Sequence, residues 1–361
     1  MRIVHFLNHT LVANGHVNVA VDLACEQVRQ GHQVWIIAAD SDHLTTLEAA
    51  GVQYVTLPMS ARGAASSLSL QTLRGLPRMG WFLRKALAKI RPDVVHSHMS
   101  FAALLAWSTR LGARYKLVTT VHNSFDRQSV LMGCADKTVC VSHAVAATMG
   151  ARGISERKLA VVWNGTRGSA RLQGAPGASA ELRHPSIVTV AGLHPRKGIA
   201  DLIEAFRLLQ NEGQPAFLYI VGSGPSETDF RQLADQTGHA DRITFLGHCP
   251  DPRTVLGDAD VFALASHADP FPLAVLEAME AGCAVVASNV DGIPEAVDHG
   301  RAGVLVPPRD PVALAAALHD LLRHPEKLAA LRAASLERAR RFSVERMAGE
   351  YVDVYASLVS A

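Results

Sequence analysis

Short apolar runs alternate with helical stretches along almost the whole chain, and this alternation constrains the fold most. Residues 2–8 open with an apolar run that predicts a strand, and residues 34–38 predict another. Between them, residues 16–30 carry apolar side chains at helical spacing and stop at Gly31. A strand, a helix and a second strand in this order form a βαβ unit, which implies a parallel sheet.

The alternation is interrupted once, at a stretch rich in Gly, Ala, Ser and Pro, and it then starts again. A chain of 361 residues suits two domains. We therefore expect an α/β fold of two doubly wound, Rossmann-like domains that face a central cleft. Their predicted ranges are residues 1–165, a linker at 166–185, and residues 186–342. An amphipathic helix at 343–361, capped by Ser343, is expected to pack back on the first domain.

Several classes of protein are excluded by composition. The beginning of the chain shows no apolar signal segment, and no run of about 18 apolar residues could span a bilayer. The five cysteines include no C-x-x-C pair, so neither a disulfide framework nor a zinc site is expected. We expect a cytoplasmic protein with no nucleic-acid partner; the alternative is a peripheral protein on the inner face of the plasma membrane.

Positive charge is concentrated in the first half. Residues 1–165 hold 17 Lys and Arg against nine Asp and Glu, and residues 49–92 contain no acidic side chain. Basic and apolar residues alternate between 81 and 90 in the manner of an interfacial helix. Residues 62–91 are therefore a candidate contact with an anionic membrane surface; the alternative is a solvated basic helix.

Two adjacent cations follow the first strand of the second half. Arg196 and Lys197 lie in a loop that leads into a helix, whose exposed N–H groups carry partial positive charge. Arginine can grip a phosphate with two parallel hydrogen bonds, and lysine adds a point charge. This predicts a diphosphate site, with a solvated basic turn as the alternative. Gly222 and Gly224 follow the next strand and would allow a ligand close to the backbone.

The stretch from residue 265 to 279 combines carboxylates with a helix start. Asp269 lies in the loop before Pro272, and Glu277 lies inside the helix that Pro272 begins. Carboxylates accept hydrogen bonds from sugar hydroxyls, while free N–H groups around Phe271, Leu273 and Ala274 bind phosphate oxygens. The alternative is that Asp269 only caps the helix and Glu277 is solvated.

The segment PFPLAVLEAMEAGCAVVASNVDGIPEAV resembles the C-terminal signature of the retaining glycosyltransferase family 4, which has the GT-B fold. The Arg196-Lys197 loop, the GSGP turn at 222–225 and Asn164-Gly165 occur in the order of that family. The resemblance implies that a nucleotide diphosphate sugar is the donor, with UDP favoured over GDP, and that no cofactor is needed. By the same resemblance, the catalytic residues are His122, Asp269, Arg196 and Lys197. The donor-binding residues would be Gly15, Gly222, Gly224, His248, Phe271, Pro272, Leu273, Ala274 and Glu277.

The sequence departs from the family pattern at three places. Asp269 replaces the first glutamate of the E-x₇-E pair and is one methylene shorter. Asn14-Gly15 replaces an N-terminal glycine pair, and Asp291 replaces the first glycine of a G-G-x-P-E element.

Two groups of residues resemble metal ligands. His96 and His98 share one side of a strand, and Asp258 and Asp260 form a D-x-D pattern. The histidine pair has no third ligand nearby in sequence, and the aspartates precede a buried strand. We predict no metal site.

These observations predict a metal-independent, retaining hexosyltransferase that acts on a glycan or a lipid-linked glycan precursor. Two rivals share the nucleotide site: a nucleotide-sugar epimerase of GT-B fold, and a nucleotide-sugar binding protein with little activity. A dinucleotide dehydrogenase is disfavoured because no G-x-G-x-x-G follows the first strand.

Overall fold

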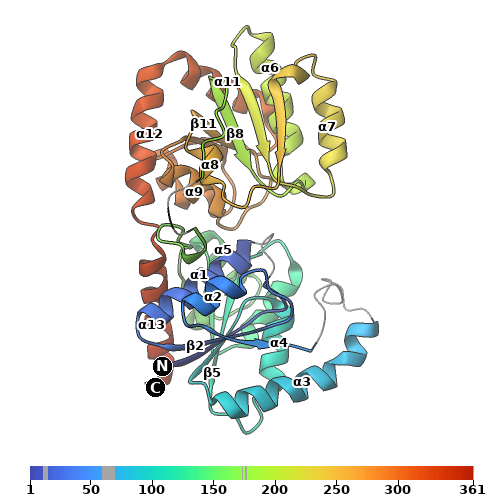
Figure 1. Cartoon of the computed structure of the whole chain (residues 1–361), viewed down its shortest axis with the longest axis vertical. Coiled ribbons are helices and arrows are strands. Elements are labelled where there is room, and N and C mark those ends of the chain that lie inside the picture. The colour runs from blue at the N-terminus through green and yellow to red at the C-terminus, as the bar shows by residue number, and fades with distance from the viewer. Residues whose placement is uncertain (11–14, 59–69, 173, 175–176, 361) are drawn as a thin grey trace. The chain divides into compact units, whose positions relative to one another are not determined.

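The structure, a computed structural model, consists of two compact units (Figure 1). It describes residues 1–10, 15–58, 70–172, 174 and 177–360, with the backbone alone for residues 70–76. Unit 1 comprises Met1–Gln173 and Val344–Ala361, and unit 2 comprises Gly174–Ser343. The predicted linker at 166–185 is thus divided between the units at residue 174.

Unit 1 is built on a seven-stranded parallel sheet with the strand order β3-β2-β1-β4-β5-β6-β7. Its strands are β1 (Arg2–Phe6), β2 (Gln33–Ala38), β3 (Gln53–Thr56), β4 (Val94–Ser97), β5 (Lys116–Val121), β6 (Lys137–Cys140) and β7 (Leu159–Val161). Its helices are α1 (Gly15–Arg29), α2 (Leu44–Ala49), α3 (Leu70–Ile90), α4 (Ser100–Ser108), α5 (His143–Ala151) and α13 (Val344–Val359). In the described part of this unit, the 3₁₀ helices are η2 (Arg127–Cys134), η3 (Glu156–Lys158) and η4 (Ala170–Leu172).

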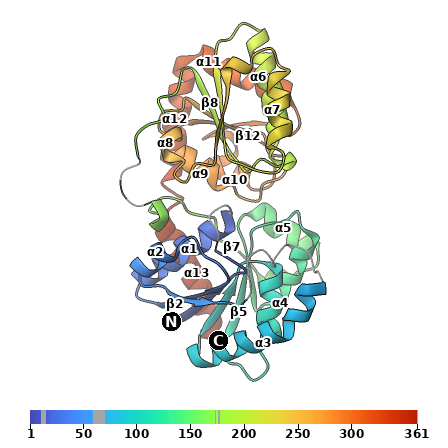
Figure 2. The same ribbon diagram turned by 45° about the vertical axis from the view of Figure 1, so that its right-hand side comes forward.

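Helices cover both faces of this sheet (Figures 1 and 2). Alternate side chains of a strand point to opposite faces. Val4 and Phe6 of β1 belong to the core that contains residues of α3 and α4, whereas His5, between them, bonds to Gln27 of α1. The face with α1 and α13 is therefore the one that receives His5.

Three apolar residues of α3, within the stretch 62–91 expected to contact a membrane, are not available to one. Leu83, Leu87 and Ile90 are buried in the core beneath the sheet, and Phe82 packs partly against it. The helical spacing that suggested an interfacial helix is the spacing of a core-facing stripe. Arg62 and the side chain of Arg74 lie outside the described residues.

Unit 2 repeats the same architecture with a six-stranded parallel sheet in the order β10-β9-β8-β11-β12-β13. Its strands are β8 (Ser186–Val190), β9 (Phe217–Val221), β10 (Ile243–Gly247), β11 (Val261–Leu264), β12 (Ala284–Ser288) and β13 (Val304–Val306). Its helices are α6 (Ile199–Asn211), α7 (Glu227–Asp235), α8 (Arg253–Leu256), α9 (Leu273–Glu280), α10 (Ile293–Ala296), α11 (Pro311–Arg323) and α12 (Pro325–Ala339). The 3₁₀ helices are η5 (Pro195–Lys197), η6 (Ala240–Arg242) and η7 (Asp298–Gly300). The α/β architecture of two doubly wound sheets is thus confirmed.

The last helix, α13, packs on α1 and β5 of unit 1. Tyr351 and Tyr355 are fully buried there, and burial of such a side chain contributes roughly 2–3 kcal/mol. Their hydroxyl groups are satisfied: Tyr351 bonds to Thr120 at 2.9 Å and Tyr355 to His96 at 2.7 Å. The helix thereby joins a polar network inside unit 1.

Both sheets change direction at one point of their strand order, between β1 and β4 and between β8 and β11. At such a switch point the connections leave to opposite sides and open a crevice at the carboxyl ends of the strands, where ligands of this fold class bind. The loops at these switch points therefore define one candidate site region in each unit.

Candidate active site

The two cations predicted to bind phosphate lie at the switch point of unit 2. Arg196 and Lys197 form η5, between β8 and α6, and both side chains are partly buried. Lys197 Nζ lies 2.5 Å from Asp269 Oδ2, with only 15% and 8% of the two side chains exposed. Arg196 Nη1 donates to the carbonyl of Ala268 at 3.4 Å. The structure thus brings three predicted site residues together from the loops after β8 and β11.

Two glycines allow these loops to approach one another. Gly198 has a φ of 65° at the beginning of α6, and a Cβ there would overlap the carbonyl of Ala265. Gly222 has a φ of 132° after β9, and a Cβ there would overlap the carbonyl of Ala191. Positive φ already disfavours other residues, and the overlap leaves no room for a side chain. A Cβ on Gly224 would likewise overlap the backbone of Leu193.

Asp291 positions the Asp269 loop, a role that the sequence did not reveal. Its Oδ2 accepts a hydrogen bond from the backbone N–H of Asp269 at 2.7 Å. Burial raises the pKa of the Asp291 carboxyl, and the nearby Asp269 carboxylate adds to this shift. A second unpredicted pair, His267 Nε2 and Asp201 Oδ2 at 2.6 Å, joins the same loop to α6. The sequence signal for the role of Asp291 was that an aspartate stands where the G-G-x-P-E pattern has its first glycine.

Helix α9 begins at the carboxyl ends of the unit 2 strands, after the loop that carries Asp269. Pro272 is its N-cap residue, so Leu273 and Ala274 lie in the first turn, where backbone N–H groups lack intrahelical acceptors. Phe271 is buried against Phe342, with ring centroids 5.7 Å apart. Glu277 is half-buried within α9, and His248 is exposed in the loop after β10. A partly buried cation, helix N-termini and carboxylates at one sheet edge can bind a phosphate group and hydroxyl groups together.

In unit 1, histidines gather at the corresponding switch point. His122 follows β5, and its Nε2 lies 3.2 Å from Nδ1 of His98, which follows β4. The His16 ring of α1 lies 6.0 Å from that of His122, centroid to centroid. Gly15 is exposed at the first position of α1, and Asn14 lies outside the described residues.

The D-x-D aspartates, Asp258 and Asp260, have structural partners at the amino ends of β8 and β11. Asp258 accepts from the backbone N–H of Leu182 at 2.6 Å, and Asp260 accepts from that of Ser186 at 2.8 Å. Both contact His184 as well. They fix the beginning of β8 against β11, at the opposite strand end from Arg196.

Two family models match successive parts of the chain and together span most of it. Residues 13–167 match Glycosyltransferase Family 4, and residues 179–338 match Glycosyl transferases group 1. The chain belongs to the GT-B glycosyltransferases. The sequence-based resemblance to this group is confirmed.

Curated relatives of this chain are themselves glycosyltransferases. A putative colanic acid biosynthesis glycosyltransferase, WcaL of Salmonella typhimurium, is 34% identical over 64% of this chain and 62% of its own length. The alignment thus leaves more than a third of that relative unmatched. The phosphatidyl-myo-inositol mannosyltransferase of Mycolicibacterium smegmatis is 28% identical over 92% of this chain and 87% of its own length.

Solved structures show the same fold. The HepE protein of Anabaena, solved in complex with UDP, superposes with a TM-score of 0.81 at 22% identity, covering 99% of this glycosyltransferase and all of HepE. A sequence identity of 22% supports a shared fold alone, so the substrates are inferred from the residues of the site.

Proposed function

We propose that this glycosyltransferase moves a hexosyl group from a nucleotide diphosphate sugar, with UDP favoured over GDP, to a glycan or lipid-linked glycan acceptor. The observation that carries the proposal is the arrangement of Arg196, Lys197 and Asp269 at the switch point of unit 2. The relatives named above support an acceptor of this kind, and the HepE complex supports UDP.

Charge explains why these residues suit the reaction. Breaking a glycosyl phosphate bond places negative charge on the leaving diphosphate and positive charge on the anomeric carbon. Fixed cations and helix N-termini stabilise the first of these charges in the transition state. In the structure Lys197 already neutralises Asp269, so the pair holds both groups in place before a donor binds. We propose that the diphosphate binds to Arg196, Lys197 and the N-termini of α6 and α9.

The remaining assignments follow the family pattern. Glu277 would bind the ribose hydroxyls, His248 would lie near the base, and Gly15 and His122 would be the unit 1 residues near the transferred sugar. The family resemblance supports retention of anomeric configuration. Because protein cations would take over the role of a metal ion, we propose a metal-independent reaction.

The Lys197–Asp269 ion pair also favours one rival. A carboxylate occupied by lysine, and one methylene short of the family glutamate, could bind a donor sugar without promoting transfer. A nucleotide-sugar binding protein would then show donor affinity without turnover, whereas an epimerase would convert the donor without an acceptor.

A panel of nucleotide diphosphates and their sugars should separate these functions. A ligand that binds only the folded state stabilises it in proportion to its affinity. Since the proposed donor carries UDP, we expect UDP to raise the melting temperature more than GDP does. Nucleotide release should require acceptor, and EDTA should leave turnover unchanged. Loss of activity in EDTA that manganese restores would contradict metal independence, and no shift with any nucleotide would contradict the donor site.

We propose a membrane contact that uses exposed residues around α3 and α4. Within the described residues, no helix is both long enough and apolar enough to cross a membrane. Large apolar side chains are nevertheless exposed around α3 and α4: Trp81 by 65%, Trp107 by 53% and Leu111 by 81%. They do not belong to the buried stripe of α3, so they are free to contact a lipid surface.

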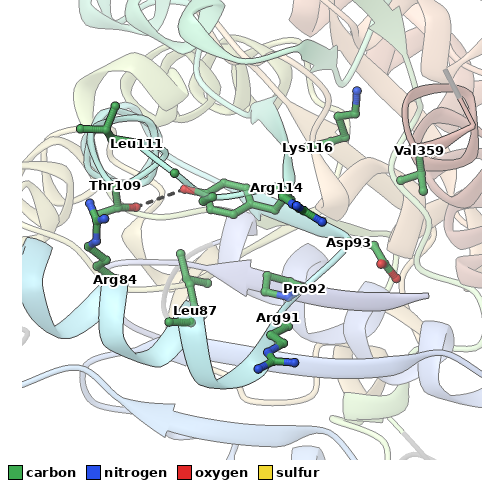
Figure 3. A pocket seen from close by; sticks show the side chains of 14 residues that line it. Arg84, Leu87, Arg91, Pro92, Asp93, Thr109, Leu111, Arg114, Lys116 and Val359 are labelled. Atoms are coloured by element: carbon green, nitrogen blue, oxygen red, sulfur yellow. Dashed lines mark hydrogen bonds between the residues drawn. The ribbon is translucent and has the colours of Figure 1, made fainter.

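Leu111 also lines a basic cavity (Figure 3). It has a volume of about 470 Å³ and lies at the amino ends of β4 and β5. An apolar groove of about 500 Å³, lined by Trp81, Phe101 and Leu104 among others, shares Arg84 and Thr109 with it. We propose that this surface rests on an anionic membrane, with headgroup phosphates at the cavity and Trp and Leu side chains at the acyl boundary. The cavity cations are Arg84, Arg91, Arg114 and Lys116.

Vesicle flotation tests this contact. The chain should float with vesicles that contain phosphatidylglycerol and not with pure phosphatidylcholine. The double variant Arg84→Glu/Arg114→Glu should bind at least about tenfold less, since each basic residue near such a surface contributes roughly 1 kcal/mol. Arg340→Glu/Arg341→Glu, a double charge reversal at two exposed arginines of unit 2, is the matched control. Equal loss in both variants would contradict the assigned surface.

A further inference from the structure

A chain of hydrogen bonds connects His122 to the interior of unit 1 through two other histidines. Nε2 of His122 meets Nδ1 of His98 at 3.2 Å, and Nε2 of His98 meets Nδ1 of His5 at 2.9 Å. Nε2 of His5 in turn meets Oε1 of Gln27 at 2.8 Å. The chain therefore runs from the switch point through three histidine rings and ends at the side-chain oxygen of Gln27 in α1.

A second branch leaves the same glutamine. Gln27 Nε2 donates to the hydroxyl of Tyr355 at 3.4 Å, and that hydroxyl meets Nδ1 of His96 at 2.7 Å. Nε2 of His96 meets Oγ1 of Thr120 at 2.7 Å. The two branches use both ring nitrogens of His5, His96 and His98.

These bonds explain a histidine cluster that would otherwise suggest a metal site. One ring nitrogen from each of His5, His96 and His98 lies within 4.8 Å of the others, and all three residues are buried. Each of their ring nitrogens already has a protein hydrogen-bond partner. A metal ion would have to break several of these bonds, so the geometry favours a hydrogen-bonded network.

The direction of donation is fixed at Gln27 if every histidine carries one proton. Burial lowers the pKa of His5 to about 4, and it lowers the pKa values of His98 and His122 well below the ordinary value, so all three are neutral at pH 7. A carbonyl oxygen only accepts, so His5 must be protonated on Nε2. Nδ1 of His5 then accepts from His98 Nε2, and Nδ1 of His98 accepts from His122 Nε2.

We propose that Gln27, His5 and His98 are positioning residues that hold His122 as the Nε2–H tautomer. The proton of His122 points into unit 1, and Nδ1 keeps a lone pair. This inference rests on the proposed function, in which His122 contacts the transferred sugar. Such a nitrogen accepts a hydrogen bond from a sugar hydroxyl or amide N–H and repels a carboxylate. Sugars that present a hydroxyl at this position are therefore preferred over uronic acids that present a carboxylate there.

The orientation of the Gln27 side-chain amide sets the direction of hydrogen-bond donation along both branches. Turning it over would place its N–H₂ group against His5 and its oxygen against Tyr355. Every donor in both branches would then become an acceptor, and His122 would carry its proton on Nδ1. The Tyr355 hydroxyl can donate as well as accept, so the orientation of the Gln27 amide decides which nitrogen of His122 carries the proton.

Nitrogen NMR of the full chain with ¹⁵N-labelled histidine tests the proposal without any substrate. Couplings across the N–H···N bonds should connect His122, His98 and His5, and His122 should show a protonated Nε2 and an unprotonated Nδ1 at pH 7.5. A protonated Nδ1 or a charged His122 ring would overturn the proposal. This readout needs no variant and does not depend on nucleotide binding, so the proposed function can fail separately.

The variant Gln27→Met removes the fixed acceptor at similar volume. Nδ1–H should become populated at His122, and kcat should fall about tenfold while the affinity of unit 2 for nucleotide is unchanged. Leu23→Met, a buried volume-conserving change on the same helix, controls for disturbed packing and should alter neither quantity. A folded Gln27→Met protein with an unchanged His122 tautomer would also overturn the proposal.

Discussion

Lys197→Ala is expected to lower kcat at least tenfold, which corresponds to about 1.4 kcal/mol of transition-state stabilisation. In the proposed reaction Lys197 has two partners, Asp269 and the leaving diphosphate, and each charge-assisted hydrogen bond contributes roughly 1.5–3 kcal/mol. The ion pair is mostly buried, so the substitution also leaves the Asp269 carboxylate without its cation. Steady-state kinetics with the cognate donor and acceptor measure the change.

Lys327→Ala is the control for this experiment. Lys327 also pairs with an aspartate, Asp320, but both side chains are about half exposed. Such a pair contributes little, so turnover and stability should stay within experimental error of the parent protein. Near-normal turnover in folded Lys197→Ala protein would count decisively against the proposed charge stabilisation.

Mild acid is expected to unfold unit 1. Burial lowers the pKa of both His5 and His16 from 6.5 to about 4 in the folded state. Between pH 6.5 and pH 4 the unfolded chain therefore binds more protons than the folded chain, and the free energy of unfolding decreases as the pH falls. Each histidine removes about 3 kcal/mol over this window, and the two together approach the whole stability of a typical domain.

Tryptophan fluorescence isolates this transition, because Trp35, Trp81, Trp107 and Trp163 all belong to unit 1. Urea unfolding at several pH values should give a free energy that falls between pH 6.5 and pH 4. His16→Asn should make the slope shallower by up to about 1.4 kcal/mol per pH unit, whereas Leu23→Met should not change it. A flat profile would show that the histidines are not held neutral.

The strands and the long helices could be predicted because they depend on local patterns. The helix predicted at 16–30 and the strand predicted at 34–38 match α1 and β2 to within one residue at each end. Helix α12 was missed because it is polar around most of its surface and has little periodic signal. The buried stripe of α3 was misread because spacing alone cannot show whether an apolar face meets a core or a membrane.

The candidate site could be predicted only in part. Arg196, Lys197 and Asp269 were singled out separately, and the structure brings them together. Asp291 and His5 were missed, since their partners are 22 and 93 residues away in sequence. Contacts of this kind arise from the strand order, which places β1 beside β4 and the β11 loop beside the β12 loop. A single sequence does not reveal which polar residues such an order makes neighbours.

The chain crosses between its units twice, and this has a consequence for biosynthesis. Every residue of unit 2 has been synthesised once Ser343 is made, whereas unit 1 receives Tyr351 and Tyr355 only afterwards. The domain that starts first on the ribosome is therefore finished last. Until α13 has been synthesised, the face of the unit 1 sheet that bears His5 and His96 lacks this helix. The whole of unit 2 then lies, in sequence, between the two parts of unit 1 that must pack together.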